Sequence, residues 1–447
     1  MVEDIYISEG DIIKISAQEI IAMWRVRKEE FIAKTIDTII ACALHLQSVM
    51  EYFGDGSKSL TKVKMAISTG VVAFSVIGSQ ERRDFVVVGE PVTELRRAKK
   101  SCVPGDVVLT ESAWSHVSPE NYEFVLRDAY NVKIIGVKED SLKFNEKSGT
   151  ETALPSEKLS YPVRNMSTTK SSKQESFTST NRISNVSVLN ASMEESELER
   201  KIFTGRFSMG EATRRKLGTH LKSFSKNPVL RQIEKDLPME HLTETRRVTV
   251  VVINLESTST SVYDVVSLID RCYILLCSKA SDYFGCVNAV TTHARDIDFI
   301  LVFGLMGSAT GDDSKNGILC ALKSVRALKG VPGVHRSSVG ISTGMVYCGV
   351  IGHVDRMEYV ILGPPIEKAI AIMSISSDKI SCEFDTIFHS RFPQKTIRSR
   401  GLRELKGFGR CHIYEIIEER SRRFQRSCRC WLLLSDLGSI SGTGLIH

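Results

Sequence analysis

The sequence lacks the features that mark a secreted or membrane-spanning protein. No apolar run reaches the roughly 18 residues that a transmembrane helix needs. No charged-then-apolar signal segment follows the opening Met-Val-Glu-Asp. The 11 cysteines are odd in number and scattered, without the paired CxxC spacing of a zinc site. We therefore expect reduced thiols, a cytoplasmic location and no transmembrane segment.

A strong excess of one charge is also missing. The 59 basic and 53 acidic residues give a net charge of +6, and the basic residues are not gathered into one patch. This distribution argues against a nucleic-acid partner. The hydrophobic content of 42% and the charged content of 25% are ordinary for a globular protein. With 447 residues, the chain is long enough for two or three domains of roughly 100–200 residues each.

An internal repeat is the most informative feature that is present. Three short motifs recur in the same order, at Ile67–Gly70, Val76–Gly78 and Phe85–Gly89 and again at Ile341–Gly344, Val350–Gly352 and Tyr359–Gly363. Their last glycines are spaced by 8 and then 11 residues in both copies, and equivalent glycines differ by 274. This offset is far longer than the roughly 20–50 residues of a solenoid repeat. The pattern therefore predicts two related domains.

Each copy predicts the same order of strands and helices. The expected elements are a strand at 62–68 or 335–342, a second strand, a further strand at 85–88 or 359–362, and a helix at 92–100 or 366–375. In the second copy, 247–255 is a continuous run of mainly Val and Ile that suits a central buried strand. Because the short regular βαβ rhythm of a doubly wound sheet is missing, the pattern favours an α+β fold.

The composition changes between the two copies and again near the C-terminal end. Residues 145–196 are rich in Ser, Thr, Asn and Lys, and helical signals return between 195 and 242. A basic cluster at 420–426 precedes the apolar run 431–434, and together they fit no regular element. We therefore predict four regions. They are a first domain (1–144), a Ser/Thr-rich linker with a connecting helical segment (145–240), a second domain (241–418) and a divergent tail (419–447), for which membrane contact is an alternative.

The motifs outside the repeat carry a family resemblance. Gly10–Lys14 and Ile20–Val26 resemble the first catalytic domain of soluble, bicarbonate-responsive adenylyl cyclases. Ser338–Ile341, Tyr347–His353 and Glu358–Tyr359 resemble the second domain, and Leu405–Gly409 resembles a further class III cyclase signature. The likeness covers about 2–137 and 247–418. It implies two ferredoxin-like βαββαβ domains of the class III cyclase type in pseudo-symmetric tandem, the first without its opening strand. The two domains are expected to pair within the chain.

The resemblance also implies a chemistry, the conversion of ATP to cyclic AMP and pyrophosphate with two Mg²⁺ or Mn²⁺ ions. One metal carboxylate belongs to the opening strand, and the position of the other is Gln18, whose neutral amide is a poor anchor for a hard cation. The transition-state Asn and Arg positions are Glu367 and Ala371, and a polar adenine contact is Val360. We expect no intact catalytic residue and no metal site. Glu19 is either a metal ligand reached by a register slip or a solvated acid.

Three basic residues occupy family positions associated with anions or nucleotide. Lys14 and Arg96 match positions linked to bicarbonate and triphosphate, and Arg295 stands at the position of a purine-binding Lys. Each has an ordinary alternative as a surface residue in a salt bridge, and His353 is expected to be structural. ATP or a related nucleotide and bicarbonate are the partners that these positions imply.

Three hypotheses follow for function. The chain is a catalytically impaired member of the soluble adenylyl cyclase family, acting in cyclic AMP signalling. Alternatively it is a pseudoenzyme that binds nucleotide, bicarbonate or a protein partner without turnover. The third hypothesis is a truncated gene product, because the absence of the expected opening strand of the first domain would leave strand edges unpaired.

Overall fold

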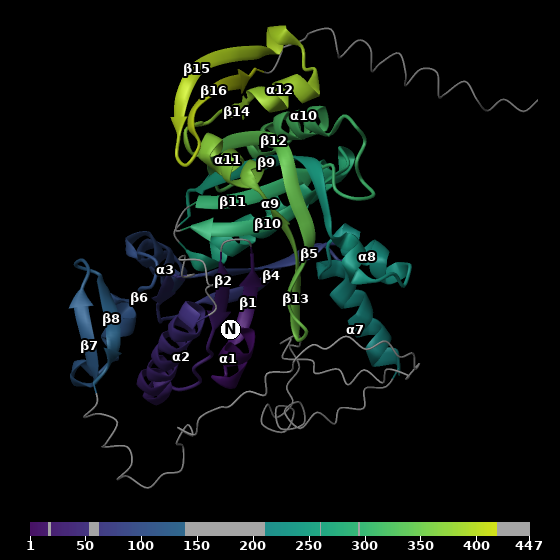
Figure 1. The fold of residues 1–447 in the computed structure, drawn as a ribbon. Coiled ribbons are helices and arrows are strands. Elements are labelled where there is room, and N and C mark those ends of the chain that lie inside the picture. The colour runs from purple at the N-terminus through teal and green to yellow at the C-terminus, as the bar shows by residue number, and fades with distance from the viewer. Residues whose placement is uncertain (17–18, 53–61, 139–210, 260, 294–295, 418–447) are drawn as a thin grey trace, which may run out of the picture. The chain divides into compact units, whose positions relative to one another are not determined.

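The computed structural model describes residues 1–16, 19–52, 62–138, 211–259, 261–293 and 296–417 (Figure 1). The predicted tail, 419–447, and most of the predicted linker lie outside the described residues. The chain divides into two compact units, each of mixed α and β structure. The first unit comprises Met1–Val72, Gly89–Phe224 and Ile351–Glu358; the second comprises Ala73–Val88, Ser225–Val350 and Tyr359–His447.

The second unit contains a βαββαβ sequence of elements. In order these are β9 (Glu244–Ser257), α9 (Val262–Asp282), β10 (Gly285–His293), β11 (Asp296–Phe303), α10 (Asp313–Leu328) and β12 (Val334–His353). The strands are arranged β10-β11-β9-β12, and β9 is antiparallel to both of its neighbours. This is the ferredoxin-like arrangement that the family resemblance implies.

The central strand β9 is buried on both faces. Val251, Ile253 and Leu255 belong to the same core cluster as residues of α9 and α10. Val248, Val250 and Val252 belong to a second cluster that includes Ala369 and Met373 of α11 (Pro364–Ser374). A strand that is covered on both faces needs consecutive apolar residues rather than alternation. The prediction of a central buried strand at 247–255 is thus confirmed.

The sheet of the second unit continues beyond β12. β14 (Ile380–Glu383) runs parallel to β12, followed by β16 (Gly409–Ile416) and β15 (Ile397–Leu405), while β13 (Arg356–Leu362) forms a hairpin with β12. Two short helical elements, α12 (Phe384–Ser390) and η4 (Gln394–Thr396), lie between these strands in the chain, and two others, α8 (Asn227–Glu234) and η3 (Met239–Leu242), precede β9.

A hairpin from the first copy of the repeat also belongs to the second unit. It consists of β4 (Ala73–Gly78) and β5 (Arg83–Val88). Ile77, Val86 and Val88 lie in the core cluster that contains α9. The Gly78 N–H donates to Asp270 Oδ1 on α9 at 2.7 Å.

The first unit has a smaller sheet. Its elements are α1 (Val2–Ile7), β1 (Asp11–Ile15), β2 (Ile20–Met23), η1 (Glu29–Phe31), α2 (Ile32–Tyr52), β3 (Met65–Ile67), α3 (Glu90–Ser101), β6 (Val107–Thr110), α4 (Glu111–Trp114), η2 (Pro119–Asn121), β7 (Tyr122–Leu126), β8 (Asn131–Val137) and α7 (Glu211–Phe224). One sheet has the order β3-β6-β8-β7, and β1 and β2 form a separate hairpin. Ile36 and Ile40 of α2 pack in one cluster with Val107 and Leu109 of β6.

The sheets of the two units can be compared strand by strand. The order β3-β6-β8-β7 corresponds to β12-β14-β16-β15, and the hairpin β1–β2 corresponds to β10–β11. Within its described residues the first unit has no counterpart of β9. Ile20 on β2 is accordingly 37% exposed, whereas Phe299 and Leu301 on β11 are fully buried.

The repeated glycines have the same structural task in both copies. Gly78 is the last residue of β4 and Gly352 is the last but one of β12, with φ angles of +107° and +126°, in the region that favours glycine. A Cβ atom at either position would lie 2.2 Å from a backbone carbonyl oxygen, of Arg82 or Arg356 respectively. The recurring glycine spacing therefore reflects the geometry of a hairpin rather than a phosphate-binding loop.

Candidate functional site

The structure brings two of the predicted anion-binding residues together around Glu19. Lys14 lies on β1 and Arg96 on α3, and the charges of both favour the ionised Glu19 carboxylate. Lys99, one turn further along α3, forms an ion pair with Glu19, with 2.5 Å between Nζ and Oε2. We call these four residues, Lys14, Glu19, Arg96 and Lys99, the Glu19 cluster.

The electrostatics of the cluster favour an ionised carboxylate. Burial is the largest single influence on Glu19 and favours the neutral acid. The hydrogen bond from Lys99 and the charges of Lys99, Lys14 and Arg96 together outweigh it, so the pKa of Glu19 lies below its ordinary value. At neutral pH this carboxylate is therefore charged and paired.

A short turn places Glu19 at the tip of the β1–β2 hairpin. The Ser16 N–H donates to the Glu19 carbonyl oxygen at 2.9 Å. The Glu19 N–H in turn donates to Ser16 Oγ at 3.2 Å. The register of the hairpin shifts between Ile12 and Lys14, as expected of a β-bulge, which re-aims neighbouring side chains. Gln18, the predicted metal position, lies outside the described residues.

Neither prediction for Glu19 anticipated its partner. The Glu19 side chain is 32% exposed and forms an ion pair with Lys99. The sequence did contain a signal for Lys99: Arg96 and Lys99 are three residues apart, so a helix places both on one face. That signal identifies a basic helix face, but not the acid that it meets.

The positions expected to stabilise the transition state lie on α11. Glu367 is in the first turn of this helix, and Ala371 is four residues further along. The Ala371 methyl group packs against the apolar cluster of Ile372, Leu405 and Ile413. Val360, at the predicted adenine position, is buried on β13. Arg295, the third predicted nucleotide-binding residue, lies outside the described residues.

A buried carboxylate anchors α11 to the sheet. Glu383 on β14 forms an ion pair with Lys368 of α11 and accepts a hydrogen bond from the Ser342 hydroxyl. It also accepts the Thr343 N–H at 3.1 Å. Burial is the largest influence on Lys368 and lowers its pKa, but the bond to Glu383 outweighs it and leaves the pKa raised. Lys368 is therefore charged and held in place.

The equivalent serine in the first copy has the same role with a different acid. Ser68 donates to Glu94 Oε2 on α3 at 3.1 Å. The Ser112 hydroxyl donates to the same oxygen. The serine of the repeated Ile-Ser-Thr-Gly motif thus bonds directly to the following helix in the first copy. In the second copy it bonds to Glu383 of β14, which pairs with Lys368 of the following helix, so the role is structural in both.

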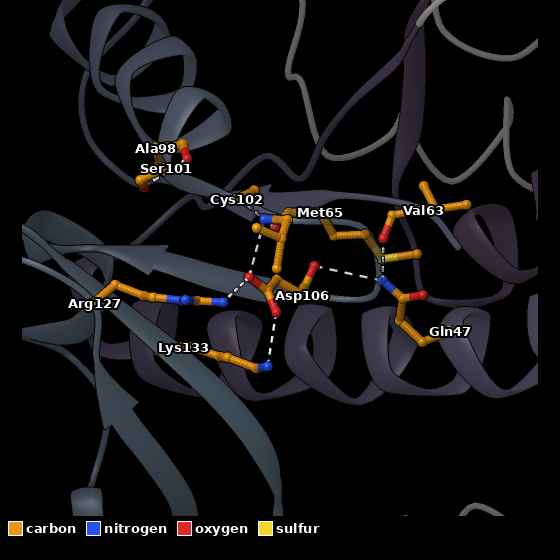
Figure 2. Close-up of polar contacts among 10 residues, drawn as sticks. Gln47, Val63, Met65, Ala98, Ser101, Cys102, Asp106, Arg127 and Lys133 are labelled. Carbon is orange, nitrogen blue, oxygen red and sulfur yellow. Dashed lines mark hydrogen bonds and ion pairs between the residues drawn. The ribbon is translucent and has the colours of Figure 1, made fainter. Parts of the chain in front are cut away.

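A second charged group in the first unit is centred on Asp106, which is buried with a side chain only 2% exposed. Figure 2 shows its carboxylate between Arg127, which follows β7, and Lys133, which lies on β8. The Lys133 Nζ atom lies 2.7 Å from Oδ1 of Asp106. The Val103 N–H also donates to this carboxylate, at 3.0 Å. Burial favours the neutral acid most strongly, yet Lys133, the Val103 N–H and Arg127 outweigh it and lower the pKa of Asp106.

The backbone of Asp106 joins further elements to this group. Its carbonyl oxygen accepts the Met65 N–H of β3 at 2.9 Å. Gln47 of α2 donates its side-chain amide to the carbonyl oxygens of Val63 and Asp106 (Figure 2). Since both the carboxylate and the carbonyl oxygen of Asp106 are bonded to partners inside the unit, we assign this residue a structural role. Its burial depends on tertiary contacts, which no local pattern in the sequence indicates.

The described residues do not fit a two-metal site. Across the ranges that the structure describes, no group of three or more His, Cys, Asp or Glu side chains is arranged to hold a metal ion. Glu19, the acid nearest the predicted metal position, is held by Lys99. The helices described also include none that is long and apolar enough to cross a membrane.

Comparisons with known proteins confirm the family resemblance. Residues 16–146 match the family described as the adenylate and guanylate cyclase catalytic domain. The chain is 23% identical over 412 residues to adenylate cyclase type 10 of Oryctolagus cuniculus, which is 92% of this chain and 23% of that protein. It is 24% identical over 410 residues to the Mus musculus protein of that name, with shares of 91% and 23%. The chain thus spans about a quarter of the length of these curated relatives.

Solved cyclase structures are also similar to parts of the chain. One is the guanylate cyclase domain of RhGC from Catenaria anguillulae in complex with GTP, with 17% identity, a TM-score of 0.34, and coverage of 40% of this chain and 100% of that one. Another is the adenylyl cyclase CyaB from P. aeruginosa, with 19% identity, a TM-score of 0.34, and coverage of 40% and 97%.

Proposed function

We propose that this cyclase-like chain binds a small oxyanion or nucleotide in the cytoplasm but does not convert ATP to cyclic AMP at a useful rate. It is then a pseudoenzyme derived from the soluble adenylyl cyclase family. The observation that carries the proposal is the environment of Ala371 on α11. At the position where the family resemblance implies a charge-stabilising Arg, a methyl group packs on Ile372, Leu405 and Ile413.

The need of cyclase chemistry for metal ions also supports an inactive chain. Cyclase chemistry of this class generally uses Mg²⁺ or Mn²⁺ held by carboxylates. Gln18 offers a neutral amide, and Glu19 is committed to Lys99. Loss of a single oriented group that stabilises developing charge typically lowers the rate by about 10²–10³. Loss of the Arg together with a carboxylate at position 18 should therefore bring turnover below detection.

The retained basic residues support a binding role. Lys14, Arg96 and Lys99 gather around one carboxylate, so the cluster carries three positive charges and one negative charge. Basic side chains that are partly open to solvent can bind an oxyanion, whether phosphate or bicarbonate. The first unit therefore keeps an electrostatic feature of a cyclase site although the chemistry of the second unit is lost.

Two assays test the proposal. Purified full-length chain is incubated with ATP and Mg²⁺ or Mn²⁺, with and without bicarbonate, and cyclic AMP is quantified by mass spectrometry. We expect no cyclic AMP. Turnover that disappears in Lys14→Ala would refute the inactive interpretation.

Binding is measured separately by calorimetry, with a non-hydrolysable ATP analogue and with inorganic phosphate as titrants. We expect heat of binding that is weakened in Lys14→Ala and in Arg96→Ala. A chain that binds neither titrant is not a nucleotide- or anion-binding pseudoenzyme.

A further inference from the structure

We propose that the edge strand β7 of the first unit pairs antiparallel with β7 of a second copy of this chain, about a twofold axis at Val125. In the described part of the chain, β7 is the last strand of the order β3-β6-β8-β7, and β8 is the strand that pairs with it (Figure 1). The outer edge of such a strand presents backbone N–H and C=O groups that can pair with another chain. The occupant that we infer for this edge is another β7.

The side chains of β7 suit an interface better than a protected edge. Phe124, Val125 and Leu126 are consecutive, with exposed fractions of 37%, 50% and 68%. The corresponding edge strand of the second unit, β15, instead exposes mainly polar and charged side chains, such as Arg398 and Arg403. Charged side chains on an edge strand oppose pairing with other chains. The three central residues of β7 carry no such charge.

The hydrogen bonds between β7 and β8 determine which backbone groups face the outer edge. The Asn121 carbonyl oxygen accepts the N–H of the residue that follows β8, at 2.9 Å. The Arg127 N–H donates to the carbonyl oxygen of the first residue of β8, at 3.0 Å. Because the backbone groups of successive residues point to opposite sides of a strand, Phe124 and Leu126 direct theirs away from β8. The extra residue at the bulge of this ladder belongs to β8, so the alternation along β7 is continuous.

One antiparallel register satisfies both outward-facing residues at once. When Val125 lies opposite Val125 of the second copy, Phe124 lies opposite Leu126 of that copy, and such a pair exchanges two N–H···O=C bonds. The same register places Glu123 opposite Arg127 of the second copy. Opposite charges on directly facing residues stabilise a strand pair. The strand β7 is therefore complementary to itself in backbone hydrogen bonds, apolar side chains and charge.

Arg127 has donors for this second carboxylate. Its Nη2 donates to Asp106. A guanidinium carries five N–H donors, so other donors are left for an acid on a neighbouring chain. The Arg127 side chain is also 31% exposed, which leaves it within reach. The pair with Glu123 of the second copy can therefore form while the bond to Asp106 is kept.

Sedimentation equilibrium of the full-length chain tests the proposal. We expect a reversible dimer whose dissociation constant rises about 10-fold in Val125→Glu, because two carboxylates would lie directly opposite each other. Within one chain the new carboxylate lies opposite Lys133 of β8, so the variant keeps a favourable neighbour. Leu402→Glu is the matched control, since it makes the same charge change at an exposed apolar position of β15. Its dissociation constant should equal that of the unmodified chain.

Mixed variants test the register. Val125→Lys alone should also weaken the dimer, because two like charges again face each other. An equimolar mixture of Val125→Glu and Val125→Lys should associate more tightly than either variant alone. This recovery requires that position 125 of one copy lies opposite position 125 of the other. A mixture that associates as weakly as its components would overturn the twofold register.

Hydrogen exchange resolved by peptide locates the contact. Peptides that contain β7 should become better protected as the protein concentration rises, because the amides of Phe124 and Leu126 gain partners, whereas peptides that contain β15 should not. A chain that stays monomeric at its highest soluble concentration would overturn the proposal. Protection of β7 that does not depend on concentration would also overturn it, since another segment of the same chain would then pair with β7. A dimer that is unchanged in Val125→Glu would show that a different surface is used.

Discussion

Replacement of Asp106 by Asn should destabilise the first unit without affecting the second. The Asp106 carboxylate is buried and receives Arg127, Lys133 and the Val103 N–H. Asparagine keeps the size of the side chain and one acceptor oxygen but removes the charge that balances two cations. The variant therefore isolates the electrostatic contribution of Asp106 from its packing.

The size of the expected loss in stability depends on how exposed Arg127 and Lys133 are. Removal of one member of a fully buried ion pair costs about 3–5 kcal/mol, because the remaining charge is left uncompensated. Arg127 and Lys133 are each 31% exposed, so water can rehydrate them in part. We therefore expect a loss of about 2–3 kcal/mol in the free energy of unfolding.

The effect should depend on pH in a defined direction. The folded pKa of Asp106 is below its unfolded value, so its stabilising contribution is present above the unfolded pKa and is lost as the pH falls through the folded pKa. The difference in stability between the unmodified chain and the Asp106→Asn variant should thus be constant near neutral pH. It should shrink when the pH is lowered well below about 4.

Hydrogen exchange resolved by peptide is the appropriate assay, since a chain with two units need not unfold in a single transition. Peptides that contain β6 should lose protection in Asp106→Asn, whereas peptides that contain β9 should not. Asp128→Asn is the matched control: Asp128 is exposed and accepts hydrogen bonds from Tyr130 and Asn131, and its loss should cost less than about 1 kcal/mol. Equal effects of the two variants, or an effect that persists in strong acid, would refute the electrostatic explanation.

Three further predictions concern the repeat. Gly352→Ala should destabilise the β12–β13 hairpin by about 1–3 kcal/mol, because its φ of +126° is strained for alanine, and faster exchange in that hairpin is the measurement. Ser342→Ala should remove one hydrogen bond to Glu383 and lower the free energy of unfolding by about 1–2 kcal/mol, measured as a lower urea midpoint. An unchanged midpoint would contradict the anchoring role of Ser342. Amides of β3 should exchange faster than those at Val339–Ile341 of β12, because β9 pairs with that part of β12; equal protection would contradict the difference between the sheets.

The parts of the fold that sequence analysis predicted are those with local signatures. The run at 247–255 indicated a strand buried on both faces because its apolar residues do not alternate, and β9 is that strand. Equal glycine spacing indicated related domains because a positive φ restricts the residue at Gly78 and Gly352. The ferredoxin-like strand order was implied by the family resemblance rather than by these local patterns.

The charged clusters around Glu19 and Asp106 could not be predicted from local patterns in the sequence. Lys99 and Glu19 are 80 residues apart, and nothing in the periodicity of α3 indicates which acid its basic face meets. Asp106 belongs to a short turn between α3 and β6 and looks like an ordinary loop acid in the sequence, yet the fold buries it. The proposals for Gln18 and Arg295 stay predictions, because both residues lie outside the described ranges.

The separate hairpin β1–β2 has a mechanical consequence. In the second unit, eight residue pairs between β11 and β9 fix the corresponding hairpin to the sheet. Among the described residues of the first unit, no strand ladder joins β1–β2 to β3; Ile12 and Ile15 instead pack with Ile5 of α1 and Leu46 of α2. Side-chain packing tolerates small sliding movements that a hydrogen-bonded ladder resists. The position of Lys14 and Glu19 in the described structure therefore depends on this apolar packing and on the Glu19–Lys99 ion pair.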